Sequence, residues 1–69
     1  MKLTANDMRV LRAMASSRRP FIAAGAATWA AIRRLGPAGL IEWAGKHMSL
    51  DRDRAFRLTQ AGRKAARRP

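Results

Sequence analysis

The stretch AIRRLGPAGLIE occupies residues 31–42 and places the end of a helix directly before the start of a strand. Pro37 lacks a backbone donor and disfavours helical structure at the residue before it. Gly39 is a natural stop, because glycine readily adopts the left-handed backbone conformation that often follows a helix. A strand is predicted to start with Leu40–Trp43. The stretch therefore predicts a sharp change from helix to strand.

The helix that leads into this stretch is predicted over Ala26–Leu35. Its apolar side chains recur every three residues and line one face: Trp29, Ile32 and Leu35. Thr28 lies beside them, four residues before Ile32, whereas Arg33 and Arg34 lie on the outer face. We therefore expect Trp29 to belong to the core.

An earlier helix is predicted from about Ala5 to Ser16. Thr4 is a suitable N-cap, and Asp7 at the third helical position supplies a short version of the capping-box acid. The sequence SSRRP at residues 16–20 then breaks the helix. Phe21 and Ile22 are expected to point inward, and residues 23–25 form either a short second helix or only a turn.

After residue 40 the pattern changes to that of a hairpin. Phe56 and Leu58 alternate with Arg57, which is strand periodicity, and residues 50–54 form a charged tip. We expect residues 40–46 to pair antiparallel with residues 55–58. Thr59 is a candidate N-cap for a short basic helix, or a frayed tail, over residues 60–66. Residues 1–66 are thus predicted to be one domain, followed by a disordered basic tail at residues 67–69.

Two strings resemble parts of small winged helix-turn-helix transcription regulators of bacteria and phages. Residues 31–42 resemble the end of the recognition helix and the first wing strand of that family. FRLTQAGR at residues 56–63 resembles the second wing strand and the Leu-Thr-x-x-Gly-Arg step that follows it. The resemblance implies a compact winged-helix-like α+β fold, with two or three helices, a C-terminal β-hairpin wing and a short terminal helix.

The chain departs from that family at the front of the presumed recognition helix. In such DNA readers this end enters the major groove with side chains that hydrogen-bond to bases. Here residues 26–31 read AATWAA, in which Thr28 is the only polar side chain. Alanine offers at most contact with a thymine methyl group. We therefore expect weak base specificity.

The charge balance points to a polyanionic partner. Fifteen Lys and Arg residues face four Asp and Glu residues, for a net charge of +11, and both halves of the chain share the excess. Such a field attracts nucleic acid, an acidic protein face or anionic lipid. Twelve of the fifteen are Arg, which suits bidentate contacts to phosphate or carboxylate.

Enzymatic and metal-dependent functions lack the residues that they need. The chain has no Cys, and its single histidine, His47, has only Asp51 and Asp53 as nearby carboxylates, too few for a metal site. The serines have no plausible base or partner acid, and no glycine-rich phosphate loop is present. We expect no enzyme activity, no cofactor and no small-molecule substrate.

The same composition disfavours a membrane protein. The longest mostly apolar stretch, Phe21–Ile32, has 12 residues, whereas a bilayer requires about 20. The N-terminus lacks a secretory pattern, and the absence of Cys is consistent with a reducing compartment. We expect no membrane partner and a cytoplasmic location, in a bacterium or in the host of a phage.

The candidate contacts to nucleic acid or a partner are mainly cationic. They are Thr28, Arg33, Arg34, Lys46, Arg52, Arg54, Arg57 and Arg63. The wing arginines can bind phosphates or can simply be solvated, with the interleaved Asp51 and Asp53 partly neutralising them. Trp43 can pack under the wing or contact a partner.

Two functions follow from this set of residues. The first is a DNA-binding transcription regulator that contacts mainly the phosphate backbone. The alternative is a small phage-type protein that binds and modulates host RNA polymerase or a defence complex. The alanine-lined helix favours the alternative, since small side chains let another protein pack closely.

Overall fold

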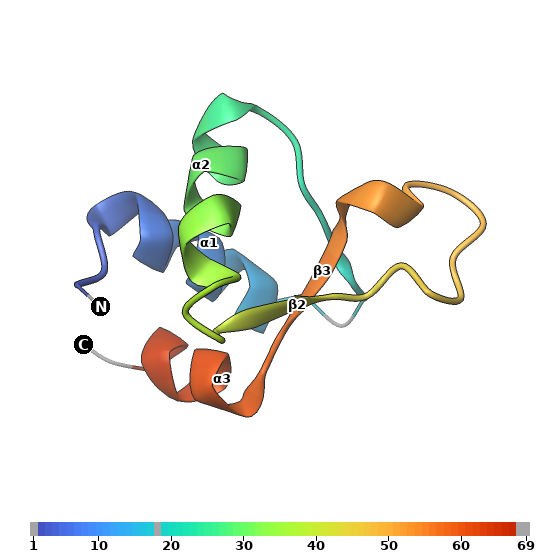
Figure 1. Ribbon diagram of the computed structural model, residues 1–69. Coiled ribbons are helices and arrows are strands. Elements are labelled where there is room, and N and C mark those ends of the chain that lie inside the picture. Colours follow the sequence, from blue (N-terminus) through green and yellow to red (C-terminus); the bar gives the residue numbers. More distant parts are fainter. Residues whose placement is uncertain (1, 18, 68–69) are drawn as a thin grey trace.

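The computed structural model describes residues 2–17 and 19–67, which form a small α+β domain. Three α-helices accompany a three-stranded antiparallel sheet in the order β1-β3-β2. The elements along the chain are α1 (Ala5–Ala15), β1 (Phe21–Ile22), α2 (Ala26–Leu35), β2 (Ile41–Trp43), the 3₁₀ helix η1 (Arg52–Arg54), β3 (Ala55–Leu58) and α3 (Gln60–Ala66). The helices gather on one side of the molecule, and the segment between β2 and β3 extends away on the other (Figure 1).

Helix α1 begins as its sequence predicts. The Asp7 amide donates to Thr4 Oγ1 at 3.1 Å, and the Thr4 amide donates to Asp7 Oδ2 at 3.0 Å, so the capping box is complete. The helix ends at Ala15 with Ser16 as its C-cap, one residue earlier than expected. The confirmed cap fixes the position of a carboxylate that also contacts α2.

Helix α2 has the predicted bounds, and the turn after it brings the chain back towards the helix. The Leu40 amide donates to the Leu35 carbonyl oxygen at 3.1 Å. Gly39 has a φ of 78°, the left-handed conformation that the sequence assigned to it. This turn directs residues 41–43 into the sheet.

Residues 23–25, which the sequence left open as a short second helix or only a turn, form no helix: Ala23 and Ala24 have no regular structure, and the chain bends at Gly25 before α2. Phe21 and Ile22 make strand β1, which pairs with β3 in the register Phe21↔Phe56 and Ile22↔Ala55. A two-residue strand has no periodicity of its own, and its structure comes from hydrogen bonds to a distant segment. Both side chains are half-buried rather than fully inward.

The predicted pairing of the two later strands is confirmed, over a shorter length. Strand β2 pairs antiparallel with β3 in the register Ile41↔Leu58, Glu42↔Arg57 and Trp43↔Phe56. The first of these two strands was predicted to reach Lys46, but β2 ends at Trp43. A turn that the Met48 amide closes on the Gly45 carbonyl oxygen, at 3.1 Å, takes the chain out of the sheet.

The core lies between the three helices and the sheet. Leu11, Val10 and Leu35 are fully buried. Trp29 is partly buried against this core, and its ring meets that of Phe56 edge to face with centroids 5.8 Å apart. The expectation that Trp29 belongs to the core is therefore confirmed.

Helix α3 closes the domain. Thr59 caps it by accepting from the Gly62 amide at 3.1 Å, and the Thr59 hydroxyl donates to the Gly39 carbonyl oxygen at 2.6 Å. Gly62 is buried against the backbone of Leu40, where a Cβ atom would collide with the Leu40 carbonyl. Residues 60–66 are thus a packed helix rather than a frayed tail. Of the expected disordered tail, Arg67 caps α3, and residues 68–69 lie outside the described residues.

Candidate functional site

Arg34 is engaged within the fold. Its Nε donates to Asp7 Oδ2 at 3.1 Å, and its Nη2 donates to the Lys2 carbonyl oxygen at 3.0 Å. The sequence predicted Arg34 as an outward contact to a partner. Its side chain is indeed 48% exposed, but its guanidinium joins the C-terminal end of α2 to the N-terminal end of α1.

Asp7 is the buried member of this pair, with 1% of its surface exposed. Burial by itself raises the pKa of Asp7, but hydrogen bonds from the backbone and side chain of Thr4 and the positive charge of Arg34 hold that pKa below its ordinary value. Asp7 Oδ1 has no hydrogen-bond partner within the described part of the chain. The carboxylate is therefore kept charged at the junction between two helices.

The outer face of α2 carries three exposed alanines and one available cation. Ala26, Ala27, Ala30 and Arg33 are exposed. Arg33 makes no hydrogen bond or ion pair with any residue in the described ranges 2–17 and 19–67. Thr28, expected as a polar contact on this helix, is 7% exposed and faces the core. Its helical spacing from Ile32 already placed it on the apolar face, so the outer face offers Arg33 alone for a polar contact.

Two of the three arginines predicted on the hairpin are paired. Arg57 Nε donates to Glu42 Oε1 at 2.7 Å, directly across the β2–β3 ladder. Arg54 forms an ion pair with Asp51, three residues earlier. All four side chains are between 40% and 65% exposed, so water competes for both pairs. The Glu42–Arg57 pair was not anticipated, since it depends on the register of the two strands.

The hairpin tip, residues 44–54, carries cationic and apolar side chains together. Lys46 and Arg52 are exposed, and neither side chain has a hydrogen bond or ion pair to another described residue. Trp43, just before the tip, is 50% exposed while its Nε1 donates to the Arg52 carbonyl oxygen at 2.6 Å. Leu50 is 75% exposed. Trp43 therefore binds the backbone of the tip through its indole nitrogen while half of its side chain stays exposed.

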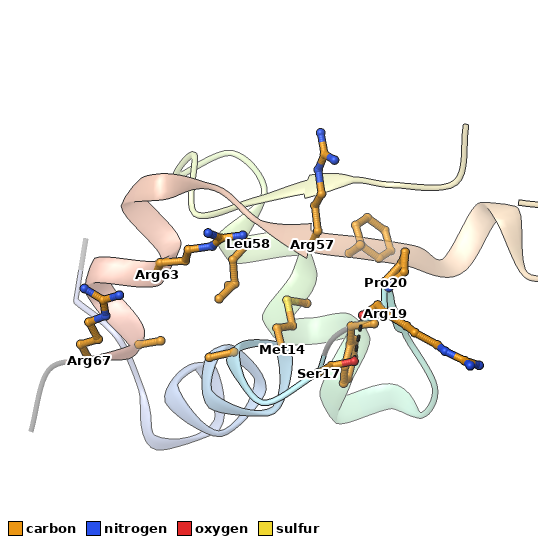
Figure 2. Close-up of a pocket in the computed structure, with 12 residues that line it drawn as sticks. Met14, Ser17, Arg19, Pro20, Arg57, Leu58, Arg63 and Arg67 are labelled. Atoms are coloured by element: carbon orange, nitrogen blue, oxygen red, sulfur yellow. Dashed lines mark hydrogen bonds between the residues drawn. The ribbon is translucent and has the colours of Figure 1, made fainter. Parts of the chain in front are cut away.

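Arg63 lies in a different place, in a groove of about 540 Å³ on the α3 side of the sheet. We define the basic groove by the residues that line it: Met14, Ala15, Ser17, Arg19, Pro20, Phe21, Phe56, Arg57, Leu58, Arg63, Ala66 and Arg67. Figure 2 shows Met14 and Leu58 pointing towards one another at its centre, with Arg63 beside Leu58, whereas Arg57 points away. This groove is formed by segments far apart in the sequence and was not predicted. The only local signal for it was the spacing of Arg63 and Arg67, one helical turn apart.

The predicted cations that have no ion pair with a described carboxylate thus lie in three places. Arg33 is at the end of α2, Lys46 and Arg52 are in the hairpin tip, and Arg63 is in the basic groove. Three of the four carboxylates are already bound to arginine: Asp7, Glu42 and Asp51. Several basic side chains have no ion pair with a described carboxylate, namely Lys2, Arg9, Arg19, Arg33, Lys46, Arg52, Arg63, Lys64 and Arg67.

Within residues 2–17 and 19–67, no three His, Cys, Asp or Glu side chains come together in a group that could hold a metal ion. The helices in this part of the chain are all too short or too polar to cross a membrane. No protein-family model, curated protein or solved structure matches the chain. The winged-helix resemblance therefore stays a prediction.

Proposed function

We propose that this protein is a winged-helix-like module that binds duplex DNA through the phosphate backbone and regulates transcription. The main support is the surplus of exposed cations over carboxylates, in a chain of net charge +11 whose few acidic groups are mostly taken by arginine. A polyanion binds such a surface by releasing its condensed counterions. The order helix, strand, helix, hairpin, helix is compatible with the winged-helix architecture.

The two regions proposed to contact DNA are the end of α2 and the hairpin tip. Arg33 supplies the cation on α2, and Lys46 and Arg52 supply those on the tip. The longest dimension of the domain is 35 Å, which is close to one turn of duplex DNA at about 34 to 36 Å. Cations on two separate elements of a domain of this size can contact several phosphates within one turn of the duplex.

Phosphate contact, rather than base reading, fits the chemistry of α2. Its exposed side chains before Arg33 are Ala26, Ala27 and Ala30, which have no hydrogen-bonding groups, and Thr28 is buried. Phosphate contacts position a protein on DNA but carry no direct sequence information. The proposal is therefore a regulator whose affinity depends little on base sequence.

The test is the salt dependence of binding to two unrelated duplexes, measured by fluorescence anisotropy between about 50 and 200 mM salt. We expect dissociation constants within about threefold of each other. We also expect a log–log slope of about −3, with about −0.9 for each phosphate contacted. Arg52→Ala should flatten this slope for both duplexes.

Arg9→Ala is the matched control, because Arg9 lies on α1 and hydrogen-bonds to Asn6. It removes the same charge outside the proposed surface and should change the slope by much less. A dissociation constant weaker than roughly 10⁻⁴ M near physiological salt would contradict the DNA proposal. An equal effect of Arg9→Ala and Arg52→Ala would contradict the assigned surface.

A second candidate function is the modulation of bacterial RNA polymerase by direct contact. It is favoured by exposed apolar side chains: Ala26, Ala27, Ala30, Trp43 and Leu50. Small residues let another protein pack closely, and half-exposed tryptophans are common anchors at interfaces. Ala30→Glu should then abolish comigration with purified polymerase in gel filtration. It should leave thermal stability within about 0.5 kcal/mol, because Ala30 is exposed.

A further inference from the structure

We propose that the basic groove binds a short acidic peptide segment that inserts an apolar side chain between α1, β3 and α3. None of the residues that line it belongs to α2 or to the hairpin tip. The site is therefore distinct from both regions proposed to contact duplex DNA. Its volume of about 540 Å³ lies within the range of about 300 to 1,000 Å³ that is usual for ligand pockets.

The floor of the groove is apolar and incompletely covered. Phe21 and Phe56 are directly paired across β1 and β3, and both are half-buried. Met14 and Leu58 also line the groove and point towards each other (Figure 2). Aromatic rings and a methionine adapt well to an inserted aliphatic or aromatic side chain. Such a side chain would remove the exposed parts of both rings from water.

The rim of the groove is cationic. Its lining includes Arg19, Arg63 and Arg67 and contains neither Asp nor Glu. Arg63 on α3 and Arg67, the C-cap of that helix, are one turn apart, so their like charges repel each other. Neither has an ion pair with a described carboxylate. A bound carboxylate would relieve this repulsion and would accept paired hydrogen bonds from a guanidinium.

An acidic peptide matches this combination better than a DNA duplex does. A duplex presents phosphates on a rigid outer surface and has no side chain to fill an apolar floor. A peptide such as Glu-Glu-Leu-Phe-Glu-Glu presents carboxylates and apolar groups a few ångströms apart. Arg63 lies beside Leu58 (Figure 2). One peptide segment can therefore place a carboxylate against the cationic rim and an apolar side chain against the floor.

The first experiment titrates the ¹⁵N-labelled full chain with the blocked hexapeptide EELFEE and with EEAAEE, which has the same charge but no large apolar side chain. We expect EELFEE to shift amides that surround the groove, including those of Ser17, Phe21 and Ala66. EEAAEE should bind about tenfold more weakly, equivalent to about 1.4 kcal/mol. Equal binding of the two peptides, or shifts centred on α2 and the tip, would overturn the proposal.

The second experiment compares two charge reversals in the same titration. Arg63→Glu lies in the groove, and Arg9→Glu changes the net charge equally on α1, outside it. Both side chains are exposed, so the amide spectrum should retain the native pattern in both variants. Arg63→Glu should weaken EELFEE binding by about tenfold or more, and Arg9→Glu should weaken it by about twofold at most. Equal weakening would mean that the peptide senses only the net charge.

A third titration uses hexathymidylate in place of the peptide. It tests whether the groove binds single-stranded nucleic acid, since bases can stack on exposed aromatic rings. If hexathymidylate shifts the groove amides at lower concentration than EELFEE, the groove takes single-stranded nucleic acid and the peptide proposal is wrong. Duplex binding tested with Arg52→Ala is independent of these results. The two proposals can therefore fail separately.

Discussion

The helical body and the hairpin tip each contain an arginine–carboxylate ion pair, but the carboxylate is buried in the body and exposed in the tip. In the body, formed by α1, α2 and α3, Arg34 binds a carboxylate that is 1% exposed. In the tip, Arg54 binds Asp51, and both side chains are at least 40% exposed. A buried carboxylate needs its partners, since removing them leaves a desolvated charge, whereas an exposed pair contributes little. The ion pair therefore links two helices in the body, whereas in the tip the arginine can exchange its carboxylate for another anion.

This difference assigns separate tasks to neighbouring arginines. Arg34 joins two helices, whereas Arg33, the next residue along the chain on the same helix, has no partner within the described residues. A phosphate would have to displace an existing bond at Arg34 but would meet an unpaired guanidinium at Arg33. Sequence position alone does not distinguish the two.

The largest expected effect comes from breaking the pair in the body. Asp7→Ala removes the acceptor for the Thr4 amide and the partner of Arg34, so we expect a loss of about 2 to 4 kcal/mol of folding free energy. Asp51→Asn is the change to compare in the tip, since it removes the carboxylate charge and keeps a side chain that tolerates the left-handed backbone at this position. It should cost less than about 1 kcal/mol. Urea denaturation monitored by circular dichroism measures both. Similar losses for the two variants would remove the distinction between body and tip.

Two glycines extend the comparison to backbone packing. An added Cβ would collide with the Leu40 carbonyl at Gly62, in the body, and with the Arg52 carbonyl at Gly45, in the tip. We expect Gly62→Ala to cost about 1 to 3 kcal/mol, because α3 is packed against the sheet and cannot move away freely. Gly45→Ala should cost less, since the exposed tip can shift into solvent. Thermal melts rank the two variants, and a larger effect at Gly45 would show the tip to be the more rigid region.

A smaller effect concerns the free energy of unfolding at acidic pH. The pKa of Asp7 is lowered in the folded state, so its contribution to stability is complete above the unfolded value near 3.8 and is lost as the pH falls through the folded value. Unfolding free energy should therefore fall below about pH 4 in the wild type. Asp7→Asn should reduce this dependence, because the amide does not titrate. An unchanged acid profile in Asp7→Asn would show that other groups cause the acid sensitivity.

Local signals in the sequence were sufficient for α1, to within one residue at its C-terminal end, and for α2. The cap at Thr4 and Asp7, the bounds of α2 and the left-handed Gly39 all depend on residues within a few positions of one another. The antiparallel pairing of residues 41–43 with residues 56–58 was also predictable from alternation between two turn signals.

Features that depend on distant segments were missed. Strand β1 has only two residues and exists through its pairing with β3, more than 30 positions away. The Asp7–Arg34 pair joins residues 27 positions apart, and the basic groove combines α1, β1, β3 and α3. The candidate site was therefore predictable in its charge and residue types, but not in its division into paired cations, unpaired cations and a groove.

Arg33 is proposed to be available to DNA, whereas Arg34 is bound within the fold. The most direct test of this central claim is the salt dependence of duplex binding in Arg33→Ala and Arg34→Ala. The two substitutions remove the same charge from adjacent positions of α2. We predict that Arg33→Ala flattens the log–log slope by about 0.9, the loss of one phosphate contact, with little effect on stability. Arg34→Ala should leave the slope nearly unchanged and should lower the unfolding free energy, because it leaves Asp7 buried without its partner. Equal flattening in both variants would contradict the assignment of Arg34 to the fold and of Arg33 to the polyanion.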